Sequence, residues 1–463
     1  MRGNDKSNLR IDKGDAMNQT RRNFIGMVGV SIAAGALADS GRKPCFRVAI
    51  MSDNQLHLND SDWGWLTLDK ALRQLAPMGI DLLVNAGDTS DSDNPAVVKK
   101  YLSRCRAALG GEVDHFACPG NHDVWLRKDC GKRTRDDAVQ DYFDCFGLSG
   151  SGRIRRRTIA GYDFVAIASS ERLPYFKEDA AAIEAVLCEC RNRDPEKPIF
   201  VITHYQPAHS VFGAVDRYGE TLRRVFDKFP QVVSLSGHTH CPLGNERMIW
   251  QDGFTAINTS TTSYGCYPGN CSNTVGGIIP FARESLGFMV MDLFDGEIEI
   301  RRYSIDDECE MTPPDKRWRL HWPYDPAKPE YGANRSAAVP RFPDGDRLVI
   351  RYDYGFVHFL FDPASGADGV ESYRFSVTSL ADDGTKGLTG DWFFISDYYR
   401  LKSKRGGRVS LRAPAFSLEP ACRYLISVYP RNWFGQEGAP LSGEFTILAG
   451  YHFRNVDESY PQE

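Results

Sequence analysis

The sequence predicts an α/β domain followed by an all-β domain, and three observations support this division. Short apolar runs alternate with longer amphipathic runs up to about residue 303, a pattern typical of strands alternating with helices. Prolines then crowd residues 306–346, and from residue 347 only short alternating runs follow. A chain of 463 residues also exceeds what one hydrophobic core usually fills, so two domains are expected.

The first domain is expected over residues 45–305 as a series of βαβ units. Its short apolar runs predict strands over residues 47–51, 81–86, 115–118, 198–202, 232–235, 254–257, 288–293 and 298–303. Its amphipathic runs predict helices over residues 66–76, 95–109, 137–146, 178–190 and 221–229. The turn residues Gly161-Tyr162-Asp163 predict a hairpin.

Residues 306–346 are expected to form a stiff, extended linker because they are rich in proline and lack a regular period. Three aromatic residues in it, Trp318, Trp322 and Tyr324, are expected to hold it against the first domain. Residues 347–450 are expected to form an immunoglobulin-like β-sandwich, with residues 451–463 as a tail. Its expected strands span residues 348–352, 356–361, 373–377, 393–396, 408–411, 424–429 and 444–448. The segment 424–435 resembles the late strand and loop of fibronectin type III domains.

Residues 1–38 show the features of an export signal in the usual order. Polar residues precede Arg21-Arg22-Asn23-Phe24, an uncharged apolar stretch follows, and Ala36-Leu37-Ala38 forms a small-x-small cleavage pattern. The paired arginines resemble a twin-arginine signal, which predicts export to the periplasm or the exterior. The apolar stretch is too short to span a bilayer, so no membrane span is expected after signal removal.

Composition narrows the classes of partner. A net charge of −5 is small for this length and gives no reason to expect nucleic acid or an anionic membrane as a partner. The twelve cysteines lack zinc-ribbon spacing, and Cys266 and Cys271 are the pair best placed for a disulfide because they bracket a turn-rich loop. Nothing in the sequence indicates an oligomeric state.

Five segments carry metal-binding side chains directly after apolar runs. In the first, the two-residue period of an extended chain puts Asp53, Gln55 and His57 on one side. In the second, Gly87 permits a sharp exit from the strand that exposes Asp88. The other candidates are Asn121, His122, Asp123, His204, His238 and His240. Strand ends meet at one edge of a sheet, and oxygen and imidazole donors without cysteine suit borderline divalent metals.

The ordered set Asp-x-Gln, Gly-Asp, Gly-Asn-His-Asp, His and Gly-His-x-His resembles the signature of the calcineurin-like metallophosphoesterases. The resemblance implies a four-layer βαβ sandwich, in which a central β-sandwich is flanked by helices, with two divalent metal ions at the loop ends. One implied metal site consists of Asp53, Gln55, Asp88 and His240. The other consists of Asp88, Asn121, His204 and His238, with Asp88 bridging the ions.

The resemblance also implies the chemistry of the site. A hydroxide bridging the two metals would attack the phosphate ester in line. His122 would protonate the leaving oxygen or hold a phosphoryl oxygen, and Asp123 would orient the imidazole. His122 and Asp123 are therefore the expected catalytic residues.

Two departures from the family pattern affect the metals. Many relatives have histidine at the position of Gln55, whose amide oxygen is a weaker ligand, and His57 is the alternative donor. Gln55 is favoured because it occupies the ligand position of the family. The chain also lacks the tyrosine that purple acid phosphatases carry three residues after Asp88, which leaves manganese, iron and zinc as candidate metals.

Several groups bear on the substrate. Seven basic residues could bind phosphate, but a solvated basic surface is favoured for Lys132, Arg133, Arg135, Arg153, Arg155, Arg156 and Arg157. Core or rim packing is favoured over stacking on a substrate for the aromatic residues Trp63, Trp65, Trp125, Tyr205, Tyr264 and Tyr267. The polar run 258–263 is expected either to line the floor of the site or to form a turn.

The predicted function is an exported, dinuclear-metal phosphoesterase acting on a small-molecule phosphate ester. Phosphodiesters are favoured because the tyrosine of the purple phosphatases is absent. A phosphomonoesterase is the near alternative. The alternative from another class is a non-catalytic protein that binds a surface partner through its C-terminal sandwich.

Overall fold

The computed structural model describes residues 42–446 except 60–61, 127–130, 171–172, 174, 270, 354–355, 382–383 and 413–421. The predicted export signal at 1–38 and the tail at 451–463 lie outside the described residues. Among the helices that the structure describes, none is both long enough and apolar enough to cross a membrane.

The first domain is built on two β-sheets. The seven-stranded sheet has the order β12-β11-β10-β1-β2-β3, with β13 pairing β11. Its strands are β1 (Phe46–Met51), β2 (Leu82–Asn85), β3 (Asp114–Ala117), β10 (Gly287–Phe294), β11 (Glu297–Ser304), β12 (Cys309–Glu310) and β13 (Trp318–His321). The six-stranded sheet has the order β4-β5-β6-β7-β9-β8. Its strands are β4 (Ile154–Ile159), β5 (Tyr162–Ile167), β6 (Ile199–Thr203), β7 (Val232–Ser236), β8 (Ile249–Gln251) and β9 (Thr255–Asn258).

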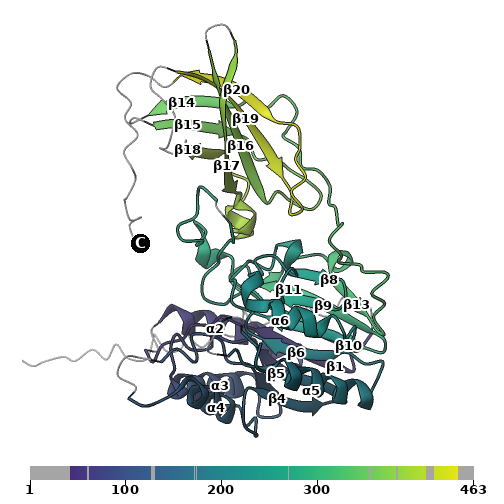
Figure 1. Cartoon of the computed structure of the whole chain (residues 1–463). Helices are drawn as coiled ribbons and strands as arrows, with labels where there is room; N and C mark the ends of the chain where they lie inside the picture. Colours follow the sequence, from purple (N-terminus) through teal and green to yellow (C-terminus); the bar gives the residue numbers. More distant parts are fainter. Residues whose placement is uncertain are drawn as a thin grey trace, which may run out of the picture.

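Five helices cover the two sheets, as predicted (Figure 1). They are α2 (Trp63–Leu75), α3 (Pro95–Leu109), α4 (Arg135–Cys145), α5 (Ala180–Arg193) and α6 (Asp216–Phe226). Local sequence sets their starts: Pro95 stands at the first turn of α3, and Thr134 and Asp137 form a capping box at α4.

Strand β5 explains how the layers are held together. Phe164 points into the core shared by both sheets, where its ring lies 4.9 Å from that of Phe200. The next residue, Val165, points to the opposite face and packs in the core formed with α5 and α6. Because successive side chains of a strand alternate, a wholly apolar strand can bury both faces. The predicted four-layer arrangement is therefore confirmed.

The segment 306–346 differs from the expected plain connector. It adds β12 and β13 to the first sheet, and both pair with β11. Trp318 is buried and its Nε1 donates to Glu246, while the Tyr324 hydroxyl donates to the carbonyl of Asp252. The aromatic residues of the segment thus hold it against the first domain, as predicted. Such short strands cannot be predicted from the sequence, because an alternating pattern needs more residues than they contain.

The C-terminal part is an all-β sandwich, as predicted. One sheet has the order β14-β15-β18 and the other β17-β16-β19-β20. The strands are β14 (Val349–Asp353), β15 (Phe356–Phe361), β16 (Ser372–Leu380), β17 (Lys386–Ile395), β18 (Val409–Arg412), β19 (Arg423–Arg431) and β20 (Leu441–Thr446). Phe359 from the first sheet meets Phe375 from the second, with ring centroids 5.8 Å apart.

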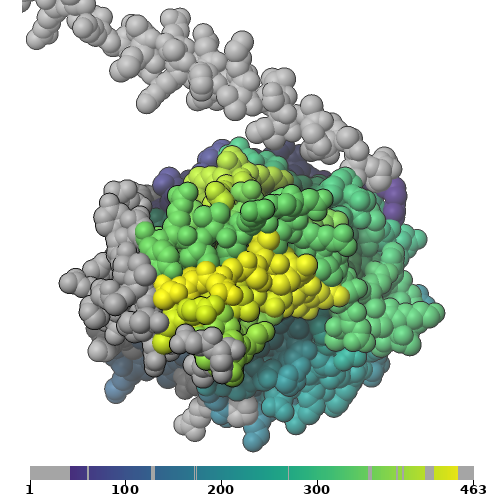
Figure 2. All heavy atoms as spheres, turned by 90° about the horizontal axis from the view of Figure 1, so that it is seen from above, coloured from purple at the N-terminus to yellow at the C-terminus, as the bar shows by residue number. Residues whose placement is uncertain are grey.

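The sandwich packs directly on the first domain. In Figure 2, seen from above, its green and yellow atoms lie over the teal atoms of the first domain. Trp433 is fully buried in a cluster that also contains Tyr267 and Tyr399. Glu371 of the sandwich is buried and forms an ion pair with Arg247, and Asn245 also donates to it at 3.0 Å. A buried charge needs such partners to offset the cost of leaving water.

Acid is expected to destabilise the first domain through His115. Only 6% of His115 is exposed, and neither ring nitrogen has a hydrogen-bond partner among the described residues. Burial lowers the pKa of His115 to about 4, below the value of 6.5 for a free histidine. The unfolded chain therefore binds the extra proton first, and stability present above pH 6.5 is lost as the pH falls toward 4.

The loss from this one residue should reach about 2–3 kcal/mol in the free energy of unfolding. Urea unfolding at several pH values, with a chelator present, measures it. His115→Leu should show a shallower loss over the same interval. Equal slopes for the variant and the wild type would contradict the assignment.

Candidate metal centre

The predicted ligand segments meet at the carboxyl ends of strands from both sheets. The loop after β1 runs beside the loop after β2, because the N–H groups of Asp53 and Gln55 donate to the carbonyls of Gly87 and Asp88, both at 2.8 Å. The loops after β6 and β7 are joined in the same way, because Gly237 N–H donates to the backbone carbonyl of His204 at 3.1 Å. Hydrogen bonds from His238 N–H to the Asp53 carboxylate, at 3.0 Å, connect the two pairs of loops.

The backbone of the ligand segments is strained. Positive φ angles, which residues with a side chain seldom adopt, occur at five predicted ligands: Asp53, Gln55, Asp88, His238 and His240. The values lie between 46° and 71°. Strain of this kind persists only where the surrounding structure enforces it, and it concentrates at functional sites.

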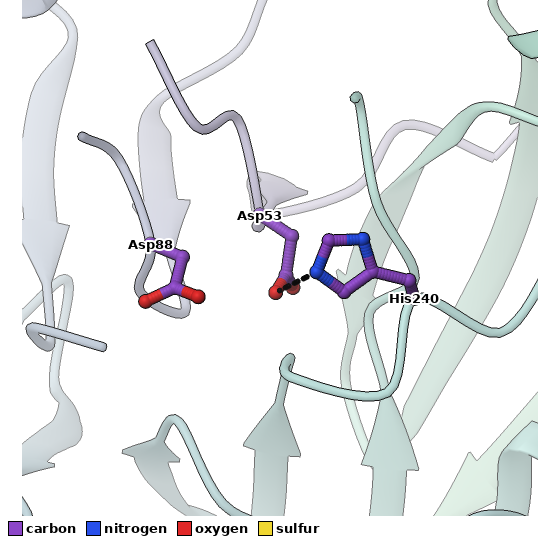
Figure 3. A group of neighbouring side chains, drawn as sticks. All are labelled: Asp53, Asp88 and His240. Carbon is purple, nitrogen blue, oxygen red and sulfur yellow. Dashed lines mark ion pairs between the residues drawn. The ribbon is translucent and has the colours of Figure 1, made fainter. Parts of the chain in front are cut away.

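One half of the centre consists of Asp53, Asp88 and His240. One ligand atom of each lies within 4.8 Å of those of the other two, and all three residues are buried. Figure 3 shows His240 pairing with Asp53, and the Nε2 to Oδ1 distance is 3.1 Å. Two buried carboxylates this close require compensating positive charge, which a divalent cation would supply.

The other half shares Asp88. His204 Nε2 lies 3.2 Å from Asp88 Oδ2 and 3.1 Å from Asn121 Oδ1. The His238 ring lies beside that of His204, with centroids 5.1 Å apart. Burial lowers the pKa of His238 to about 4, so its imidazole is neutral and keeps a lone pair for a cation. Asp88 therefore stands between two groups of donors.

Two ligand histidines are held in the tautomer that a metal needs. His204 Nδ1 faces the carbonyl of Ala86 and His240 Nδ1 faces the carbonyl of Tyr264, both at 2.9 Å. A carbonyl can only accept, so Nδ1 carries a hydrogen, which leaves Nε2, the nitrogen that faces the carboxylates, as the one whose lone pair would bind a cation. The donor set thus fits two divalent cations.

Residues 46–242 match the family of the calcineurin-like phosphoesterases. This part of the chain is a metallophosphoesterase domain. Among solved structures, the chain is similar to purple acid phosphatase PPD1 isolated from yellow lupin (Lupinus luteus) seeds, with 13% sequence identity and a TM-score of 0.42. That similarity covers 61% of this chain and 54% of the lupin chain, so only about half of the lupin protein is matched. No curated protein matches the sequence.

Glycines allow the close approach of the loops in the metallophosphoesterase domain. A Cβ on Gly120 would lie 2.1 Å from Asp88 Oδ1, and one on Gly87, where φ is +99°, would lie 2.6 Å from His204 Nδ1. No side chain fits in either place. Gly87 and Gly120 therefore allow the two loops to pack closely around the Asp88 carboxylate.

Gln55, and not His57, is brought to the centre. Gln55 Oε1 accepts from the Ser263 hydroxyl at 3.3 Å, on the loop that also carries Tyr264. The His57 side chain is 55% exposed and faces Asp62 and Asp91 at 3.7 and 3.9 Å. The preference for Gln55 over His57 agrees with this placement.

The predicted partner of His122 is wrong. Asp123 does not orient the imidazole: its carboxylate accepts from the N–H groups of Gly120 at 2.9 Å and Ser90 at 2.8 Å. Burial raises the pKa of Asp123 to about 7. Asp123 thus ties the Gly-Asn-His-Asp turn to the loop after β2. The reason is geometric, because a tight turn directs adjacent side chains in different directions.

The residue that contacts His122 is Asp91, which the sequence reasoning missed. His122 Nδ1 lies 3.2 Å from Asp91 Oδ1, and this hydrogen bond raises the pKa of His122 to about 9. His122 is therefore cationic at neutral pH. The signal was present in the sequence: Asp91 stands three residues after Asp88, where purple acid phosphatases have their tyrosine.

The polar run 258–263 forms the floor of the site. Thr261 Oγ1 donates to the carbonyl of Asp53 at 3.1 Å, and Asn258 Nδ2 donates to the carbonyl of Gly237 at 3.2 Å. Both side chains are buried. The run therefore supports a ligand loop from each sheet.

Most of the predicted basic cluster has partners away from the metal centre. Arg133 pairs with Asp93, Arg156 with Glu189 at 2.8 Å, and Arg157 with Asp114 at 2.8 Å. Arg153 lies 3.0 Å from Asp136, and Arg155 is buried against the carbonyls of Leu148 and Gly152 in the loop before β4. The structural interpretation favoured for these residues agrees with their contacts.

The predicted disulfide is wrong, because both Cys266 and Cys271 are free. Cys266 N–H instead donates to the carbonyl of His240 at 2.9 Å, so its backbone supports a ligand loop. Two residues after Cys271, the side chain of Asn273 pairs with the backbone of Ile395 in the sandwich. One end of this loop therefore contacts a ligand loop, and the chain just beyond its other end contacts the sandwich.

Proposed function

We propose that this protein is an exported, dinuclear-metal-dependent phosphoesterase that prefers phosphodiesters. The position of Asp88 carries the proposal. Its carboxylate lies against His204 and in the same group as Asp53 and His240, so one buried carboxylate is shared by two sets of donors. A shared carboxylate is what a pair of ions requires of a protein.

In this proposal the predicted ligands take the roles assigned from the sequence. One ion would be held by Asp53, Gln55, Asp88 and His240, and the other by Asp88, Asn121, His204 and His238. Oxygen and imidazole donors suit manganese, iron or zinc. Two such ions would lower the pKa of water and stabilise charge on the phosphoryl oxygens.

His122 is proposed to donate a proton to the leaving oxygen. Its backbone N–H donates to Asp88 at 2.9 Å, which keeps the residue beside the shared carboxylate. Asp91 holds Nδ1 on the other side of the ring, which leaves Nε2 free to face a substrate. A cationic imidazole in this position supplies general acid catalysis.

Charge supports the preference for diesters. A phosphomonoester at neutral pH carries more negative charge than a diester, and arginine is the usual partner for such a group. Five arginines of the predicted basic cluster have partners elsewhere: Arg133, Arg153, Arg155, Arg156 and Arg157. Asp91 also occupies the position of the tyrosine of purple acid phosphatases.

Export and the C-terminal sandwich belong to the same proposal. The twin-arginine-type signal predicts delivery of the protein to the periplasm or beyond, and that route carries folded proteins. The strand orders β14-β15-β18 and β17-β16-β19-β20 support a fibronectin type III-like domain. The buried pair of Glu371 and Arg247 favours a packed accessory domain over an independent binding module.

A substrate panel with defined metals tests the function. Protein stripped with a chelator and then loaded with manganese, iron or zinc is assayed on bis-p-nitrophenyl phosphate, p-nitrophenyl phosphate and cyclic nucleotides. We expect turnover only in the loaded protein, with kcat/KM at least about 10-fold higher for the diester than for the monoester, a difference of about 1.4 kcal/mol.

Each result of the panel separates the candidates. Faster hydrolysis of the monoester would make the protein a phosphomonoesterase. No turnover of any ester with any of the three metals would contradict the proposed enzyme and favour the surface-binding alternative.

A further inference from the structure

Trp125 is an exposed aromatic side chain beside the proposed general acid. Its ring lies 5.5 Å from the His122 ring at an interplanar angle of 71°, and 59% of the residue is exposed. Among the other aromatic residues of the predicted set, Trp65, Tyr205 and Tyr267 are buried, and Trp63 and Tyr264 are half-buried. Trp125 therefore has most of its surface available to a ligand at this point of the domain.

The backbone under this ring is fixed. Trp125 N–H donates to the carbonyl of His122 at 3.0 Å, and its carbonyl accepts from Asp93 N–H at 3.2 Å. The preceding residue, Val124, is buried in the core. A large aromatic side chain on a fixed backbone loses little entropy when it binds a flat partner.

The charged groups beside His122 are paired with one another. Asp91 contacts His122, and its side chain is 40% exposed. Arg133 pairs with Asp93, whose N–H donates to the Trp125 carbonyl. The exposed indole of Trp125 therefore offers an uncharged, flat group an apolar contact that these ion pairs do not provide.

These observations deepen the proposed function, on which this inference rests. We propose that Trp125 is a specificity-determining residue that stacks on an uncharged aromatic leaving group, such as a phenyl ring or a nucleobase. The general acid must face the leaving oxygen, so the group that departs with that oxygen lies next to His122. The exposed indole beside it provides the stacking surface for that group.

The test compares two methyl phosphodiesters whose leaving groups have matched acidity, one an aryl group and the other a fluoroalkyl group. For the aryl ester, Trp125→Ala is expected to lower kcat/KM by about 10-fold, within the range of about 5- to 100-fold that stacking on one ring provides. For the fluoroalkyl ester the change should stay within about 2-fold. Trp125→Phe should retain most of the preference for the aryl ester because it keeps a ring.

Leu66→Ala is the matched control, since Leu66 is a similarly exposed apolar residue, at 53%, on α2. It should change neither rate. Equal losses for both esters in Trp125→Ala, or no loss for either, would overturn the inference while leaving the phosphoesterase function intact. A wild-type protein that hydrolyses neither ester with any of the three metals would overturn the proposed function and this inference together.

Discussion

Replacing Asp88 with Asn is expected to remove at least one metal ion and to lower kcat/KM for bis-p-nitrophenyl phosphate by more than about 100-fold. Residues that only orient a ligand already contribute about 10- to 100-fold to metal affinity or activity. Asp88 lies against His204 and in a group with Asp53 and His240, so in the proposed centre it would contact both ions. Metal analysis and steady-state kinetics on the same preparation measure both effects.

Asp114→Asn is the matched control for this substitution. Asp114 is a carboxylate at the opposite end of β3, where it pairs with Arg157 at 2.8 Å on the surface. This variant should keep both ions and full activity. Asp88→Asn should remain folded under the assay conditions, which its unfolding in the presence of a chelator checks. Retention of two ions by Asp88→Asn would contradict the shared-ligand role.

Replacing His122 with Ala is expected to lower kcat by about 100- to 10,000-fold for an alkyl leaving group, the range of general acid catalysis. The metal content should not change, because the structure places the imidazole against Asp91 rather than among the ligands. The loss should be smaller for p-nitrophenol, which leaves without needing a proton. The ratio of the two losses separates proton donation from a general defect.

Asp91→Asn provides the second variant for this prediction. An amide cannot stabilise the imidazolium as a carboxylate does, so the kcat loss should show the same dependence on the leaving group but be smaller. Loss of metal in His122→Ala would move His122 into the ligand set. A uniform loss across leaving groups would remove its role as the acid.

The sequence indicated which side chains would lie near one another, because each predicted ligand follows an apolar strand. Asp53, Asp88 and His204 lie two, three and one residues after the ends of β1, β2 and β6, where each apolar run ends. Parallel pairing brings the carboxyl ends of β1 and β2 together, whereas β6 lies in the other sheet. The order of these segments along the chain was therefore enough to indicate which side chains lie near one another.

Contacts between loops were not predictable in this way. Asp91 and Asp123 are both acidic, and only the folded turns decide that Asp91 faces His122 while Asp123 accepts backbone N–H groups. The positive φ angles of the ligands also arise from tertiary constraints, because even aspartate and histidine adopt such angles in only a minority of cases. The short strands β12 and β13 were missed because sheet pairing, and not a local pattern, defines them.

The sequence indicated the start of the sandwich but not its docking. The change from mixed to all-β patterning was placed at residue 347, and the strands of the sandwich begin with β14 at Val349. Its docking was not foreseen, because Glu371 and Arg247 are far apart in the sequence and neither belongs to a motif. Trp433, which stood in a fibronectin-like segment, proved to be buried between the two domains.

The central claim is that Asp88 is shared by two metal ions, and anomalous diffraction from crystals of the metal-loaded protein tests it most directly. Data collected at the absorption edge of the bound metal should give two peaks flanking the Asp88 carboxylate. One peak is expected against Asp53, Gln55 and His240, and the other against Asn121, His204 and His238. A single peak, no peak, or peaks away from Asp88 would contradict the account.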